Sequence, residues 1–197
     1  MTEVIPLFPL RTVLYPGGSL RLRIFEPRYL NMVSRCLRED IGFGVALIRE
    51  GAEVGPALTY EVGTLARISD WYTLNDGLLG ITAVGIERFR LHQTVRQNDG
   101  LVLATVEMRG AERRAALEAR HTGAIAALET LQSLANDQES KAQGEKDDVA
   151  TVAARLAELL PVSSAQKQAW LEIDDPVERL DAIMPTVALL RQRPPKA

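Results

Sequence analysis

The sequence predicts an α+β fold. A small, closed or partly closed antiparallel β-barrel with one inserted helix is expected over residues 1–110, and an all-helical bundle over residues 111–197. Apolar residues alternate with polar ones in the first part and recur at helical spacing in the second, and the change falls near Gly110. Composition changes at the same place: residues 1–110 hold 12 arginines, 12 carboxylates and no lysine, whereas all four lysines come later.

Short runs between turn residues predict the strands of the first part. The first run, Val4–Leu10, contains Pro6 and Pro9, which suits an edge strand or a bulged one because proline donates no hydrogen bond to a sheet. A strong hairpin signal, Asn75-Asp76-Gly77, joins two of the longer runs. The runs after the first are Leu20–Ile24, Leu58–Leu74, Leu78–Leu91 and Leu101–Met108.

One helix is predicted among these strands. Pro27 suits the first position of a helix, and Gly42 ends the helical pattern. The apolar residues that recur at helical spacing between them are Tyr29, Val33, Cys36 and Leu37.

Apolar stripes predict the helices of the second part. One stripe runs over residues 117–135 and another over residues 149–160. Between them residues 136–148 are polar, which predicts a mobile connection. Ser163 and Gln166 have the spacing of a capping box for a third helix. Asp175 with Pro176 begins a fourth helix, which Pro185 should kink or split.

Composition excludes several classes of function. The net charge is -3 and the isoelectric point about 5.5, so no overall positive field attracts nucleic acid or an anionic membrane. No run of about 18 apolar residues is present to span a bilayer, and residues 1–10 lack the pattern of a secretory leader. The single cysteine, Cys36, forms no internal disulfide. A cytoplasmic location without membrane attachment is therefore expected.

The sequence lacks the residue spacings that are typical of known catalytic centres. No lysine is followed by serine or threonine, so a phosphate-binding loop is excluded. The two histidines, His92 and His121, lack HExxH spacing, and Cys36 lies on an apolar helical stripe. The pairs at residues 147–148 and 174–175 precede helices, where carboxylates act as caps. We therefore expect no catalytic residue, no metal site and no cofactor.

A series of motifs in the first part resembles the amino-terminal (LON) domain of the ATP-dependent Lon proteases. The order and spacing of the motifs match over residues 4–108, and the most specific is Ile24-Phe25-Glu26-Pro27-Arg28-Tyr29. The other segments that carry the resemblance are Pro6–Arg11, Tyr15-Pro16-Gly17, Phe43-Gly44-Val45, Tyr60–Ile68 and Gly85–Arg90. Residues 166–180 are similar to the helical part that follows the barrel in that family.

The resemblance implies a PUA-like β-barrel followed by a helical bundle, and a role in recognising substrate polypeptides. Full-length members continue into an ATPase and a Ser-Lys protease domain, which this sequence does not contain. We therefore expect a stand-alone LON-domain protein that is not an enzyme and acts as a quality-control adaptor. Its expected partners are unfolded or extended polypeptides and a separate ATP-dependent protease.

Candidate contact residues are aromatic side chains beside predicted turns, together with neighbouring arginines. Aromatic rings offer apolar area, and guanidinium groups donate to peptide carbonyls or carboxylates. The candidates for peptide binding are Tyr15, Arg23, Arg28, Trp71 and Tyr72. The alternative function is RNA binding, since PUA-like barrels also occur in RNA-associated proteins, but the balanced charge of residues 1–110 counts against it.

Overall fold

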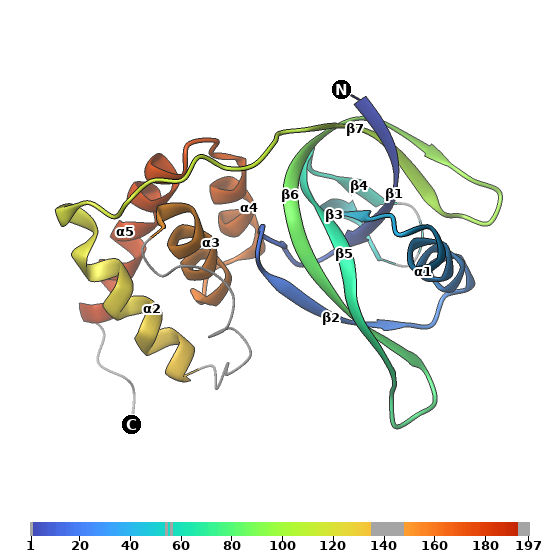
Figure 1. Cartoon of the computed structure of the whole chain (residues 1–197), viewed down its shortest axis with the longest axis horizontal. Coiled ribbons are helices and arrows are strands. Elements are labelled where there is room, and N and C mark those ends of the chain that lie inside the picture. The colour runs from blue at the N-terminus through green and yellow to red at the C-terminus, as the bar shows by residue number, and fades with distance from the viewer. Residues whose placement is uncertain (1, 54, 56, 135–147, 193–197) are drawn as a thin grey trace. The chain divides into compact units, whose positions relative to one another are not determined.

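The computed structural model describes residues 2–53, 55, 57–134 and 148–192, and these divide into two compact units at Ala111 and Glu112. Strands and α1 make up unit 1, and the later helices make up unit 2 (Figure 1). In chain order the elements are β1 Thr2–Leu10, β2 Ser19–Ile24, α1 Pro27–Glu39, β3 Phe43–Gly51, β4 Ala57–Thr59, β5 Val62–Thr73, β6 Leu79–Arg96, β7 Val102–Met108, the 3-10 turn η1 Ala119–His121, α2 Thr122–Leu134, α3 Val149–Leu159, α4 Ser164–Glu172 and α5 Pro176–Gln192. The fold is mixed α+β.

The strand pairings of unit 1 form a closed circuit. Its order is β1–β7–β6–β5–β3, and β3 pairs again with β1. Four of these five pairings are antiparallel, but β1 and β3 run parallel, with Leu7 beside Gly44 and Leu10 beside Leu47. The sheet is therefore antiparallel, as the sequence predicts, apart from this one pairing. Two parallel strands need a long crossover connection between them, and helix α1 lies in the connection from β1 to β3.

Strand β1 is not an edge strand, which is one of the two arrangements that its prolines suit. It pairs with β7 over residues 2–7 and with β3 over residues 7–10. Pro6 therefore has a paired strand on the β7 side and Pro9 on the β3 side. One open side at each proline lowers the cost of the missing N–H donor.

Two apolar clusters lie on the two faces of this sheet. The larger joins the strands to α1, through Tyr29, Met32, Val33 and Cys36. Leu37, expected on the same face, is 45% exposed. The smaller cluster is centred on Phe89, together with Ile5, Leu7, Ala46, Ala104 and Val106.

Side-chain caps fix the helices of unit 2. The Asp148 carboxylate accepts from the Thr151 N–H at the start of α3, and the Ser163 hydroxyl accepts from the Gln166 N–H at the start of α4. At α5 the N–H of Val177, 2.8 Å away, holds the pKa of the Asp175 carboxyl below its ordinary value. Pro185 lies inside α5. Of the connection expected to be mobile, residues 136–147 lie outside the described residues.

Candidate functional site

The β5–β6 hairpin and β2 form a three-stranded surface in which β6 is the middle strand. Gly80 of β6 pairs with Arg23 of β2 on one side and with Tyr72 of β5 on the other. Residues opposite one another in a sheet share a face, so Arg23 and Tyr72 project from the same face on either side of a glycine. Arg21 occupies the equivalent position two residues before Arg23, opposite Thr82.

Gly80 lets the Tyr72 ring lie across the middle strand. A Cβ atom at this glycine would lie 2.4 Å from Cε2 of Tyr72, so no other residue fits without moving the ring. The ring fills the space that a side chain at position 80 would take. The sheet therefore holds Tyr72 in place.

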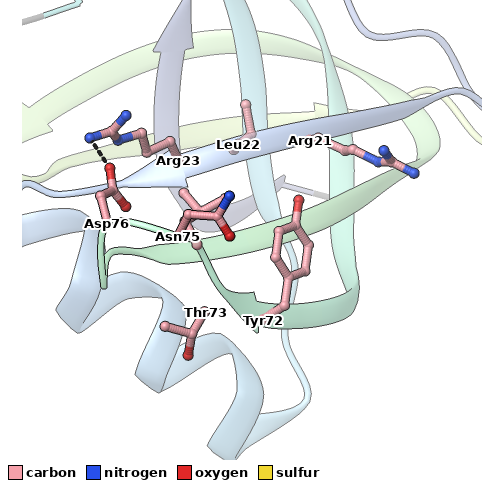
Figure 2. Close-up of a pocket in the computed structure, with 8 residues that line it drawn as sticks. Arg21, Leu22, Arg23, Tyr72, Thr73, Asn75 and Asp76 are labelled. Atoms are coloured by element: carbon pink, nitrogen blue, oxygen red, sulfur yellow. Dashed lines mark ion pairs between the residues drawn. The ribbon is translucent and has the colours of Figure 1, made fainter.

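A groove follows this surface from β2 to the tip of the hairpin. Its volume is about 690 Å³, and Figure 2 shows the side chains that border it. We call it the hairpin groove, lined by Arg21, Leu22, Arg23, Tyr72, Thr73, Leu74, Asn75 and Asp76. The Asp76 carboxylate forms an ion pair with Arg23, marked in Figure 2. The groove therefore combines an aromatic ring with guanidinium, amide and carboxylate groups.

Trp71 lies on the other face of the same hairpin. It pairs with Ile81, whereas its neighbour Tyr72 pairs with Gly80, and successive residues of a strand point to opposite faces. Its side chain is 62% exposed. The structure therefore does not bring Trp71 into the hairpin groove, although it places the ring on the surface as the sequence predicts.

Tyr15, expected to be an exposed aromatic residue, is 0% exposed, so this expectation is wrong. The turn that contains it packs on β6. The Gly17 N–H donates to the Gly85 carbonyl at 2.8 Å, and a Cβ atom at Gly85 would lie 2.2 Å from the Tyr15 carbonyl oxygen. A turn can expose its backbone while its aromatic side chain is buried, and the sequence pattern does not distinguish the two.

Arg28 is also buried, so it is not a polar anchor on an exposed surface. Its guanidinium donates to the carbonyls of Gly100, at 3.0 Å, and Glu53, at 3.2 Å, and pairs with the Glu26 carboxylate at 2.8 Å. The same group lies 4.6 Å from the centre of the Tyr29 ring. These contacts tie the start of α1 to two loops and give Arg28 a structural role.

Four polar lining residues of the hairpin groove are not among the candidates from the sequence: Arg21, Thr73, Asn75 and Asp76. Arg21 had a detectable signal, because it alternates with Arg23 and so shares its face. From the sequence, Asn75 and Asp76 are predicted only as turn residues. Their place beside β2 depends on the pairing of β2 with β6, which the sequence does not reveal.

The cysteine and the histidines lie in separate environments. Cys36 is buried beside the Gly42 carbonyl, and burial raises its pKa to about 11, so the thiol is protonated at neutral pH. His92 Nε2 lies 3.1 Å from the Glu107 carboxylate on the surface, and buried His121 lies 2.8 Å from Asp181. Within the described residues, no group of three or more His, Cys, Asp or Glu side chains is arranged to hold a metal ion.

No helix in the described part of the chain is long and apolar enough to cross a membrane.

Comparisons with known proteins cover almost the whole chain. Residues 4–188 match the family described as the ATP-dependent protease La (LON) substrate-binding domain. The crystal structure of a Lon N-terminal domain protein from Xanthomonas campestris is 35% identical, with a TM-score of 0.77 over 98% of this chain and 99% of that one.

Curated relatives are much longer than this chain. A Lon protease of Phenylobacterium zucineum (strain HLK1) is 27% identical over 97% of this chain and 25% of that protein. Lon protease 2 of Myxococcus xanthus is 30% identical over 48% of this chain and 12% of that protein. The chain thus spans a quarter or less of the length of these relatives, and the family match covers nearly all of the chain. This chain belongs to the LON substrate-binding domain family.

Proposed function

We propose that the chain recognises extended polypeptide substrates without catalysing a reaction, and that the hairpin groove is the contact surface. Membership of a substrate-binding family supports the kind of ligand. The observation that carries the site is the row Arg23–Gly80–Tyr72, in which a glycine makes room for the Tyr72 ring on the face of the sheet from which Arg23 also projects. A rigid surface of this kind loses little conformational entropy on binding.

The groups that line the groove can contact both the side chains and the main chain of an extended peptide. The Tyr72 ring offers apolar area, the guanidinium groups donate to carbonyls or carboxylates, and the Asn75 amide can both donate and accept. Arg23 forms an ion pair with Asp76, and Arg21 lies in one cross-strand row with Asp70, because both are opposite Thr82. With these carboxylates among the arginines, no strong positive field favours a nucleic acid. We expect affinity on the order of micromolar or weaker, because a flexible peptide must be ordered.

The closed strand circuit of unit 1 is proposed to be a PUA-like β-barrel, and unit 2 its helical subdomain, with the boundary near Gly110. The chain is proposed to act in protein quality control, as an adaptor to a separate ATP-dependent protease. The likeness to proteins named Lon protease and to a Lon N-terminal domain protein supports this proposal.

The test uses an unfolded polypeptide, fluorescein-labelled β-casein, and fluorescence anisotropy with the full chain. Arg23→Glu reverses a charge in the groove and should weaken binding at least about fivefold, an energy of about 1 kcal/mol. Arg38→Glu is the matched control, since Arg38 is an exposed arginine of α1 outside the groove. It should leave binding unchanged.

Equal effects of the two substitutions, or none from either, would remove the groove from the proposal. Casein or ATP hydrolysis that disappears with a point substitution in this chain would show that the chain is an enzyme. Recovery of the chain with an ATP-dependent protease from its own cell extract tests the adaptor role separately.

A further inference from the structure

A second hollow in unit 1 is lined by β4 and β6, two strands that do not pair with each other. The Leu91 N–H donates to the Glu61 carbonyl at 2.7 Å, and this is where β6 leaves its neighbour β5. A bulge between Leu91 and Gln93 then redirects β6, which continues beside β7 as far as Arg96. Strand β4, in contrast, pairs with β3. Strands β4 and β6 therefore have different partners, and an opening lies between them.

The floor of this opening is the smaller apolar cluster of the unit. We call it the β4 hollow, and Leu7, Leu91 and Val102 line its base while the exposed Leu58 stands at its side. Its volume is about 250 Å³, below the range of roughly 300–1,000 Å³ for small-molecule pockets. The space suits one large apolar side chain and is too small for a cofactor.

Among the described residues that line the hollow, Arg96 is the one that carries a charge. The pairings of Leu7 with Val102 and of Val102 with Arg96 place all three on one sheet face. Arg96 Nη2 donates to the Gly55 carbonyl at 3.0 Å, which holds the guanidinium at the rim. An arginine has five N–H donors, so this bond uses one of them. The hollow thus combines an apolar base with a fixed cation at its mouth.

We propose that the β4 hollow binds the carboxyl terminus of a polypeptide that ends in a large apolar residue. The terminal residue of such a polypeptide carries an apolar side chain and a carboxylate on the same Cα. The side chain can enter the apolar hollow while the carboxylate accepts a hydrogen bond from Arg96 at its rim. An apolar residue inside a chain brings no charge of its own to Arg96. The inference rests on polypeptide recognition by unit 1, but its residues are different from those of the hairpin groove.

The test compares two labelled octapeptides that end in leucine, one with a free carboxylate and one amidated, both titrated into the full chain. The free acid should bind about tenfold more tightly, the effect of one charge-assisted hydrogen bond. Arg96→Gln should reduce this preference to less than twofold. Equal binding of acid and amide to the unaltered chain would overturn the proposal.

Filling the hollow provides a second, independent variant. Thr94 lines the hollow, so Thr94→Phe should abolish binding of the free acid. Val95→Phe is the matched control, because the next residue of the strand points to the opposite face and Val95 is already exposed. Thermal unfolding verifies that both variants fold. Unchanged binding to a folded Thr94→Phe chain would contradict the proposal, whereas loss of casein binding in Arg23→Glu alone concerns only the hairpin groove.

Discussion

At the residue scale, two glycines make room for Phe89 in the smaller cluster. A Cβ atom at Gly63 would lie 2.5 Å from the Val45 carbonyl oxygen and 2.5 Å from Cζ of Phe89. At Gly44 the nearest atoms are side-chain carbons of Ile5 and Phe89 at 3.0 Å. Side chains can shift, but a backbone oxygen in a paired strand cannot do so without breaking its pairing.

Gly63→Ala should therefore destabilise the chain more than Gly44→Ala. Overpacking a core costs about 1–3 kcal/mol, and we expect Gly44→Ala near the lower end of that range and Gly63→Ala at or above its upper end. Urea unfolding of the two variants measures the difference. Equal midpoints would show that the strands relax around either methyl group.

Arg179 allows a comparison of a buried ion pair with an exposed one. It is 0% exposed and binds both carboxylate oxygens of Glu112, at 2.7 and 2.9 Å. Arg113 pairs with Asp175 at 3.1 Å on the surface. Arg179→Met leaves a buried carboxylate without its bidentate partner and should cost about 3–5 kcal/mol of unfolding free energy. Arg113→Met should cost less than about 1 kcal/mol, and similar losses in thermal or urea unfolding would contradict this.

The Cys36 thiol predicts a pH dependence. Burial raises its pKa from 9.0 to about 11, so folding favours the protonated thiol. The contribution of this thiol to the free energy of unfolding is complete below pH 9, its pKa in the unfolded chain. That contribution is lost as the pH rises from about 9 to 11. Urea unfolding of the chain and of Cys36→Ala at pH 8 and pH 11 should show a smaller pH effect in the variant. Equal pH effects in both would count against a buried thiol.

Residue exposure limits what the sequence predicts about the site. Trp71 and Arg23 lie exposed, whereas Tyr15 is buried although it too lies close to a turn, Pro16-Gly17. The difference comes from the packing of that turn against Gly85, a contact between residues about 70 positions apart. Local pattern identifies turns, but it does not tell which of them rest on another strand.

At the element scale, local signals predict the helices and the hairpin well. Pro27 begins α1, Ser163 caps α4, and the turn at residues 75–77 joins β5 to β6, as the sequence indicates. The run predicted over residues 58–74 is divided into β4 and β5, and β6 extends five residues beyond Leu91, to Arg96. Bulges and strand partners decide such ends, and neither has a clear signal in one sequence.

Pro185 does not split the last helix, because α5 runs as one helix from Pro176 to Gln192. A proline inside a helix removes one backbone hydrogen bond, and this one is exposed to solvent. Pro185→Ala should therefore stabilise unit 2, by about 1–3 kcal/mol. Thermal unfolding followed by circular dichroism at 222 nm measures it, and a lower midpoint would show that the proline is required for packing.

At the scale of the whole molecule, the change in hydrophobic period near Gly110 lies next to the division between the units at residues 111 and 112. Periodicity does not reveal how the strand circuit closes, because the parallel pairing of β1 with β3 joins residues about 37 positions apart. The hairpin groove depends on a similar long-range pairing, that of β2 with β6. Sequence pattern thus predicts elements, while pairings at long range build both the circuit and the groove.

The central claim is that the hairpin groove of unit 1 contacts polypeptide substrates. Hydrogen–deuterium exchange of the full chain, with and without an excess of an unfolded, carboxyl-amidated polypeptide, tests it most directly. We expect slower exchange over residues 19–24 and 72–79, which form β2 and the hairpin tip, and no change in α3 or α5. Protection confined to the helices of unit 2, or no protection of β2 and the hairpin at saturating polypeptide, would contradict the account.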